Sequence, residues 1–228
     1  MTTTLRALRL AHRGDWRRAP ENTLEALAAA LANPNCDGVE FDVRLSRDRV
    51  PMVIHDESLQ RVQGIGRRVD AVDAVDLEAA GVPTLAATLA LVVERRPTAF
   101  LDVELKGADH GRRTADILRE GLGDEPQHAV VSSFEAATLD TVRAWLPRWG
   151  RWLNADDSAR AAIDRAASLG CTGVSLEWHR IDEVAVAHAS GAGLEVAAWT
   201  IRDRDTARRM DALGLRAVCV EADALDGR

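Results

Sequence analysis

The sequence predicts an α/β fold, a single (β/α)8 TIM barrel, and three observations lead to this prediction. Short apolar runs typical of buried strands alternate with longer amphipathic segments typical of helices. Eight such units within 228 residues fill a closed barrel better than an open sheet. No linker rich in Gly, Ser or Pro divides the chain, so we expect one domain over residues 1–228.

The eight predicted strands are residues 5–12, 38–45, 99–105, 128–134, 151–154, 172–178, 193–200 and 217–222. A ninth apolar run, residues 50–56, follows the second strand after a connection too short for a parallel crossover. These two runs should therefore form a hairpin. Residues 57–98 then become a small insertion between the second and third barrel strands.

Composition excludes several classes of function. Asp and Glu outnumber Lys and Arg by 36 to 29, giving a net charge of −7, which argues against a nucleic-acid partner. The three cysteines (Cys36, Cys171 and Cys219) are odd in number and share no short spacing, so we expect reduced core thiols in a cytoplasmic protein. No apolar run is long enough for a signal sequence or a membrane span. The sequence leaves the oligomeric state open.

Two predicted strands carry acidic residues at alternate positions. Glu40 and Asp42 share one face of the second strand, and Asp102, Glu104 and Lys106 share one face of the third. The apolar face of each strand should meet the helices, which turns these carboxylates toward the barrel interior or mouth. Uncompensated carboxylates there are costly, and a hard divalent cation, Mg²⁺ or Ca²⁺, would relieve that cost. The alternative is a set of acids that are solvated or paired with Lys106 and nearby arginines.

Two histidines stand at strand ends near these acids. His12 closes the first strand and His55 closes the extra run. An isolated histidine is usually a hydrogen-bonded structural group, but two beside a cation could serve as general acid and base. Arg13 adds a planar fork that suits phosphate oxygens. Together with Lys106, these groups favour attack on a phosphoester.

The segment after His12 also contains a helix start. Asn22 is followed three residues later by Glu25, a spacing that approximates a capping box. We therefore expect Asn22 to be the N-cap of the first helix, which would explain Asn22 without a role in function.

The sequence strongly resembles the glycerophosphodiester phosphodiesterases. The resemblance rests on motifs that occur in the family's order along nearly the whole chain: HRG at 12–14, PENT at 20–23, EFDV at 40–43, PMVIHD at 51–56, VPTL at 82–85, VELK at 103–106, VSSF at 131–134 and AWT at 198–200. It implies the same barrel with an insertion after the second strand. It also implies a metal-dependent hydrolase that converts substrates such as glycerophosphocholine or glycerophosphoethanolamine to glycerol 3-phosphate and an alcohol.

The resemblance also implies roles for individual residues. Glu40, Asp42 and Glu104 would bind one divalent cation, His12 and His55 would be the acid–base pair, Arg13 and Lys106 would hold the phosphate, Trp199 would line the mouth, and Glu21 would support the site from behind. The chain departs from the family pattern in two places. Ala86 and Ala87 stand where an acidic residue is frequent, and Val220 and Glu221 stand where Thr-Asp is frequent.

Two other functions stay open at the level of sequence. One is a lysophospholipase D or a sphingomyelinase D-like activity on the same barrel, for which an apolar mouth would be expected. The other is a barrel that binds a phosphodiester without turnover. Loops rich in Arg, Asp and Gly, with few aromatic residues, make the first of these less favoured. The presence of both histidines and all three acids argues against the second.

Overall fold

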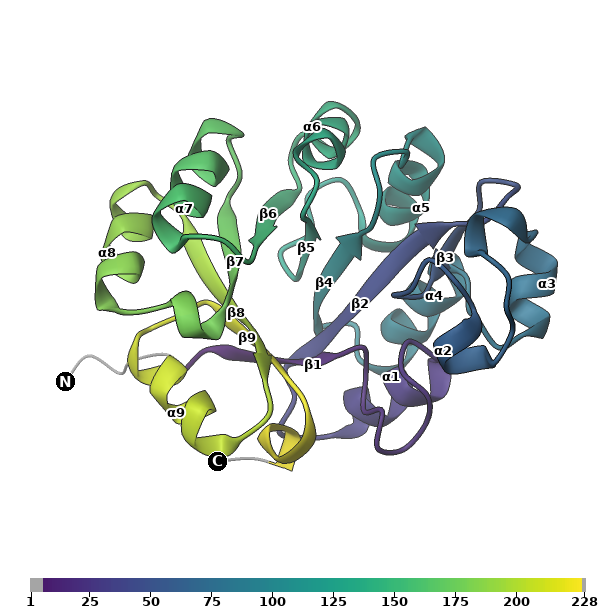
Figure 1. Ribbon diagram of the computed structural model, residues 1–228, viewed down its shortest axis with the longest axis horizontal. Coiled ribbons are helices and arrows are strands. Elements are labelled where there is room, and N and C mark those ends of the chain that lie inside the picture. Colours follow the sequence, from purple (N-terminus) through teal and green to yellow (C-terminus); the bar gives the residue numbers. More distant parts are fainter. Residues whose placement is uncertain (1–5, 227–228) are drawn as a thin grey trace.

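The computed structural model describes residues 6–226, so Leu5, the predicted start of the first strand, lies outside the described residues. Parallel strands close into a barrel, with the helices arranged around the outside (Figure 1). In order around the barrel the strands are β1 (Leu8–His12), β9 (Ala217–Val220), β8 (Glu195–Ile201), β7 (Gly173–Glu177), β6 (Gly150–Ala155), β5 (Ala129–Ser133), β4 (Phe100–Leu105) and β2 (Gly38–Leu45). A β1–β2 pairing closes the ring, which confirms the predicted barrel.

The outer layer consists of helices that connect successive strands. They are α1 (Leu24–Ala32), α4 (Leu85–Arg95), α5 (Arg112–Leu122), α6 (Ala136–Trp145), α7 (Ala159–Ser168), α8 (Glu183–Gly191) and α9 (Arg204–Ala212). Short 3₁₀ segments, η2 (Trp178–Arg180) and η3 (Ala222–Asp226), follow β7 and β9. The predicted core cysteines Cys36, Cys171 and Cys219 are buried and unpaired. None of the helices in residues 6–226 combines the length and apolar character that crossing a membrane requires.

Strand β2 shows why the charged groups face inward. Val39, Phe41 and Val43 are fully buried in the core between the strands and the helices. Because successive side chains of a strand point to opposite faces, Glu40 and Asp42 turn to the barrel interior. Burying the apolar face therefore fixes the direction of both carboxylates.

The predicted hairpin is confirmed, because β3 (Pro51–Val53) pairs antiparallel with β2. After β3 come α2 (Gln60–Gln63), η1 (Val69–Ala71) and α3 (Ala74–Ala79). A separate apolar cluster, which includes Met52, Leu59 and Leu77, holds this segment together. The segment that contains α2, η1 and α3 extends outward beyond β3 at the edge of the barrel (Figure 1). Helix α4 also falls within the range 57–98, but it packs with α1 and α5 in the outer layer.

The predicted capping box is wrong. The N-cap of α1 is Thr23, whose backbone is extended and whose hydroxyl accepts a hydrogen bond from Ala26 N at 3.2 Å. Asn22 has a left-handed backbone, φ +59°, which an N-cap does not adopt. Its side chain is turned away from the helix and into the barrel, where Nδ2 donates to Asp42 Oδ2 at 2.9 Å.

Candidate active site

The turn after β1 brings Arg13 against β2. Arg13 and Gly14 both have positive φ, +58° and +84°. A Cβ at Gly14 would lie 2.6 Å from the carbonyl carbon of Ala26, so only glycine allows this close approach to α1. The turn points the backbone N–H of Arg13 at Glu40, where it donates to the main-chain oxygen at 2.9 Å and to Oε2 at 3.1 Å.

Glu40, Asp42 and Glu104 converge where the middle of β2 lies beside the carboxyl end of β4. Each offers an oxygen, and these oxygens all lie within 4.8 Å of one another. The register explains the convergence, because Asp42 lies directly beside Glu104 on the neighbouring strand. Glu40 Oε1 is buried and has no hydrogen-bond partner among the described residues. Three carboxylates with an unpartnered buried oxygen form a donor set that suits a hard divalent cation.

Two cationic side chains surround this carboxylate cluster. Lys106 Nζ lies 2.5 Å from Glu104 Oε1 and 3.1 Å from Asp42 Oδ1. Arg13 Nε lies 3.2 Å from Asp42 Oδ2. The pairing with Lys106 and arginine that we considered as an alternative is therefore present, but two cations leave part of the charge of three carboxylates uncompensated.

The pKa values of the cluster follow from burial and from these neighbours. Burial raises the pKa of Glu104 to about 7, with a further increase from Asp42. Burial, together with Asp42 and Glu104, also holds the pKa of Glu40 well above its usual range. Burial acts in the same direction on Asp42, but Lys106 and Arg13 more than offset it and lower its pKa to about 2. Without another cation, the cluster therefore retains protons near neutral pH.

Each predicted histidine has a carboxylate partner at Nδ1. His55 Nδ1 lies 2.7 Å from Asp56 Oδ1, and His12 Nδ1 contacts Glu221 Oε1. A carboxylate at Nδ1 favours the tautomer with the proton on that nitrogen and leaves Nε2 available. His12 Nε2 lies 3.8 Å from Glu40 Oε2. Burial lowers the pKa of His55, although Asp42 acts in the opposite direction.

Glu21 lies behind the site, where it joins Arg13 to the insertion. It accepts from Arg13 Nη1 at 3.0 Å and from Arg61 Nη1 at 2.8 Å. Arg61 also donates to Asp56 Oδ2 at 2.6 Å. A continuous set of ion pairs therefore connects Arg13 to the partner of His55.

His12, His55, Arg13, Lys106 and Trp199 line one cavity of about 140 Å³ together with Glu40 and Glu104. Trp199 is fixed at its mouth by a hydrogen bond from Nε1 to Ser175 O at 3.1 Å. The ring of Phe134 meets Trp199 edge to face at 5.7 Å. The cavity thus has acidic and basic groups on one side and aromatic rings at its mouth.

Four residues make contacts in the site that the sequence did not predict. Asn22 contacts Asp42, Glu221 contacts His12, Arg61 contacts Asp56, and Phe134 contacts Trp199. Glu221 had been noted only as a departure from the family pattern, and Phe134 only as part of the VSSF motif. Arg61 lies in the insertion and carries no motif that could have identified it.

The chain is similar to known proteins in both sequence and structure. The model of the glycerophosphoryl diester phosphodiesterase family matches residues 12–222. The chain is 24% identical to the Bacillus subtilis protein YhdW over 93% of both chains. It is 33% identical to a human lysophospholipase D over 50% of this chain and 38% of that protein. An Oleispira antarctica phosphodiesterase, solved with the product sn-glycerol-3-phosphate, superposes with a TM-score of 0.80 at 27% identity, covering 94% of this chain and 93% of that one.

Proposed function

The chain belongs to the glycerophosphoryl diester phosphodiesterase family, and we propose that its site hydrolyses glycerophosphodiesters to glycerol 3-phosphate and an alcohol. The observation that carries the proposal is the convergence of oxygens of Glu40, Asp42 and Glu104 within 4.8 Å of one another, beside a cavity that both His12 and His55 line. Glycerophosphocholine and glycerophosphoethanolamine are the substrates we expect.

One divalent cation, Mg²⁺ or Ca²⁺, would be held by Glu40, Asp42 and Glu104. Glu40 Oε1, which is buried without a hydrogen-bond partner, supports this assignment because such an oxygen is costly unless an ion meets it. When bound, the ion would polarise a phosphate oxygen as a Lewis acid.

The histidines carry the protons in this proposal. One histidine accepts a proton from the attacking oxygen through Nε2, and the other donates a proton to the departing alkoxide. If water attacks, this step gives glycerol 3-phosphate directly. If the neighbouring glycerol hydroxyl attacks, it gives a cyclic phosphate, which water then hydrolyses to glycerol 3-phosphate. Asp56 and Glu221 hold the rings at Nδ1, so each Nε2 is directed at the cavity. The imidazolium that forms at either ring is stabilised by its carboxylate partner.

Arg13 and Lys106 would hold the phosphate. Both side chains line the cavity, and both are positioned by carboxylates of the cluster. Their charges offset the negative charge that develops on the phosphoryl oxygens during attack. Trp199 would contact the alcohol at the mouth, and Glu21 would keep the Arg13 guanidinium in place.

Release of choline from glycerophosphocholine tests the proposal directly. We expect release to require Mg²⁺ or Ca²⁺ and to stop when a chelator is added. Lysophosphatidylcholine serves as the comparison, since a lysophospholipase D would prefer it. Faster turnover of lysophosphatidylcholine would replace our proposal with that activity, and binding of glycerophosphocholine by calorimetry without product would indicate a binding protein.

A further inference from the structure

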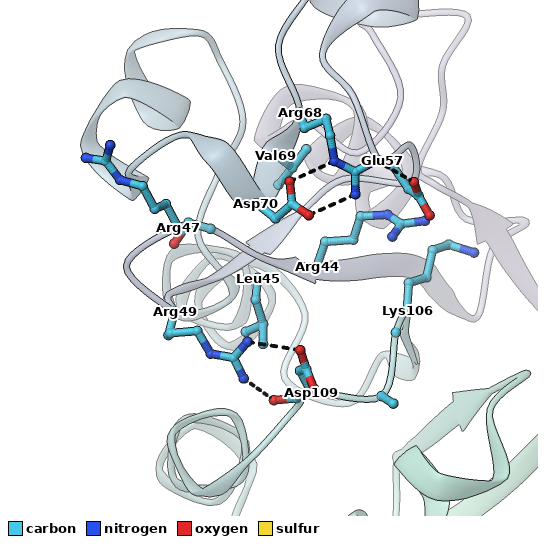
Figure 2. A pocket seen from close by; sticks show the side chains of 13 residues that line it. Arg44, Leu45, Arg47, Arg49, Glu57, Arg68, Val69, Asp70, Lys106 and Asp109 are labelled. Carbon is cyan, nitrogen blue, oxygen red and sulfur yellow. Dashed lines mark hydrogen bonds and ion pairs between the residues drawn. The ribbon is translucent and has the colours of Figure 1, made fainter.

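A second cavity lies next to the active-site cavity, and Figure 2 shows the side chains that line it. Its volume is about 350 Å³, within the range of pockets that hold small molecules. Its walls come from the end of β2, the segment after β4 and the insertion. Lys106 lines both cavities, so they are neighbours.

Cationic side chains outnumber acidic ones on these walls. The cations are Arg44, Arg47, Arg49, Arg68 and Lys106, and the acids are Glu57, Asp70 and Asp109. Arg68 bonds to Glu57 at 2.9 Å and to Asp70 at 2.8 Å, which accounts for two of the acids. Asp109 lies 3.5 Å from Arg49. All three carboxylates on the walls are therefore already engaged.

Arg47 pairs with Asp73, which is not part of the walls. Arg44 is therefore the arginine of the walls that these pairings leave available. Its Nε donates to the main-chain oxygen of His55 at 2.7 Å, and it forms no ion pair with a carboxylate in residues 6–226. Figure 2 shows the side chains of Arg44 and Lys106 extending toward the same side of the pocket. The terminal nitrogens of Arg44 thus remain free to bind an anion beside Lys106.

Arg44 lies on the same strand, β2, as two of the carboxylates beside the proposed phosphate site. Glu40, Asp42 and Arg44 alternate along one face of this strand, so Arg44 lies one pleat beyond Asp42, roughly 7 Å along the strand. Phe134 also lies close to Lys106, with Nζ 5.9 Å from its ring centre. The aromatic rings of the active-site cavity and the pocket that contains Arg44 therefore both border Lys106, the residue that we propose holds the phosphate.

We propose that Arg44 makes the enzyme prefer glycerophosphodiesters whose alcohol carries an anionic group, such as the carboxylate of glycerophosphoserine. A guanidinium with two free nitrogens matches a carboxylate in fork geometry. The carboxylate of serine lies two carbons beyond the bridging oxygen, and Arg44 likewise lies beyond the residues that would hold the phosphate. This inference rests on the proposed function and adds to it a substrate class.

A matched pair of substrates tests the preference. Glycerophosphoserine differs from glycerophosphoethanolamine only by the carboxylate, so the ratio of their kcat/KM values isolates its contribution. We expect the wild-type ratio to favour the serine ester by roughly tenfold or more, the factor typical of one hydrogen-bonded charge pair. This measurement needs no variant and so does not depend on the folding of one.

Variants then assign the preference to Arg44. Arg44→Gln should bring the ratio close to one, and Arg44→Lys should retain part of the preference because it keeps the charge. Arg67→Gln is the control, since it removes a charge from the insertion at an exposed residue that does not line the pocket, and it should keep the wild-type ratio.

Each outcome supports or overturns the assignment. A wild-type ratio near one overturns it, and so does an Arg44→Gln variant that slows both substrates equally, which would mean that Arg44 acts only through His55. Hydrolysis of glycerophosphoethanolamine with no preference defeats this inference and leaves the proposed function standing. Failure to hydrolyse either ester defeats both.

Discussion

The two halves of the barrel contribute different kinds of groups to the same cavity. From β1 to β4 the chain supplies charged and titratable groups: His12, Arg13, Glu40, His55, Asp102, Glu104 and Lys106. From β5 to β9 it supplies side chains without a formal charge: Phe134, Asn154, Ser175, Trp199, Thr200 and Cys219. We propose from this difference that the first half carries the chemistry while the second half shapes the cavity. Substitutions should therefore affect kcat in the first half and KM in the second.

The largest effect should come from the histidines of the first half. His12→Ala and His55→Ala should each lower kcat by about a hundredfold or more, because each removes a group that transfers a proton. Steady-state hydrolysis of glycerophosphocholine measures this loss. His188→Ala is the control in the second half, because His188 lies on α8 and contacts Asp164. This variant should keep the wild-type kcat. Near-normal turnover by either active-site variant would remove that histidine from the mechanism.

A smaller loss should follow from Glu221, which comes after the last strand but serves the first half through His12. Glu221→Gln keeps the shape of the side chain and removes the charge that orients the ring. We expect kcat to fall roughly tenfold, as is common when a residue that orients a functional histidine is changed. Glu221→Asp should recover part of the loss. Unchanged kcat in the Gln variant would show that His12 needs no carboxylate at Nδ1.

The carboxylates of the first half should also make stability depend on pH. The folded-state pKa of Glu104 is raised to about 7, so its contribution to stability is complete below its ordinary pKa near 4.5 and is lost as pH rises through 7. Between about pH 6 and pH 8, ionisation of Glu104 should lower the free energy of unfolding by about 1 kcal/mol. Urea unfolding in chelator should show the decline, and Mg²⁺ or Ca²⁺ should restore more stability at pH 8 than at pH 6. Equal stabilisation at both pH values would contradict a cation at Glu104.

The smallest effect should come from the second half. Trp199→Phe keeps an aromatic ring at the mouth and removes the hydrogen bond to Ser175 O, which contributes about 1 kcal/mol. We expect KM to rise severalfold with little change in kcat. A loss in kcat comparable to that of the histidine variants would contradict the division between the two halves.

Local sequence patterns predicted the strands of the site well. The bounds of β2 agree with the predicted run 38–45, because its alternation of apolar and charged residues reflects a barrel interior on one side and helices on the other. The same alternation indicated the inward direction of Glu40, Asp42 and Glu104. Roles for these acids and for the histidines came from resemblance to a family, and they stay proposals.

Contacts between distant residues could not be predicted in this way. Asn22 follows the local pattern of an N-cap, yet it contacts Asp42, 20 residues away in the chain. Glu221 meets His12 across 209 residues, and only the pairing of β1 with β9 brings them together. The Arg44 pocket likewise needs the insertion folded against the ends of β2 and β4.

We propose that Glu40, Asp42 and Glu104 together hold one divalent cation. A crystal soaked with Mn²⁺ tests for this ion, because the anomalous signal of manganese locates it without reference to activity. We expect one strong peak in contact with oxygens of all three carboxylates. A map with no peak there, and with Lys106 Nζ still bonded to Glu104 and Asp42 at saturating Mn²⁺, would contradict the claim.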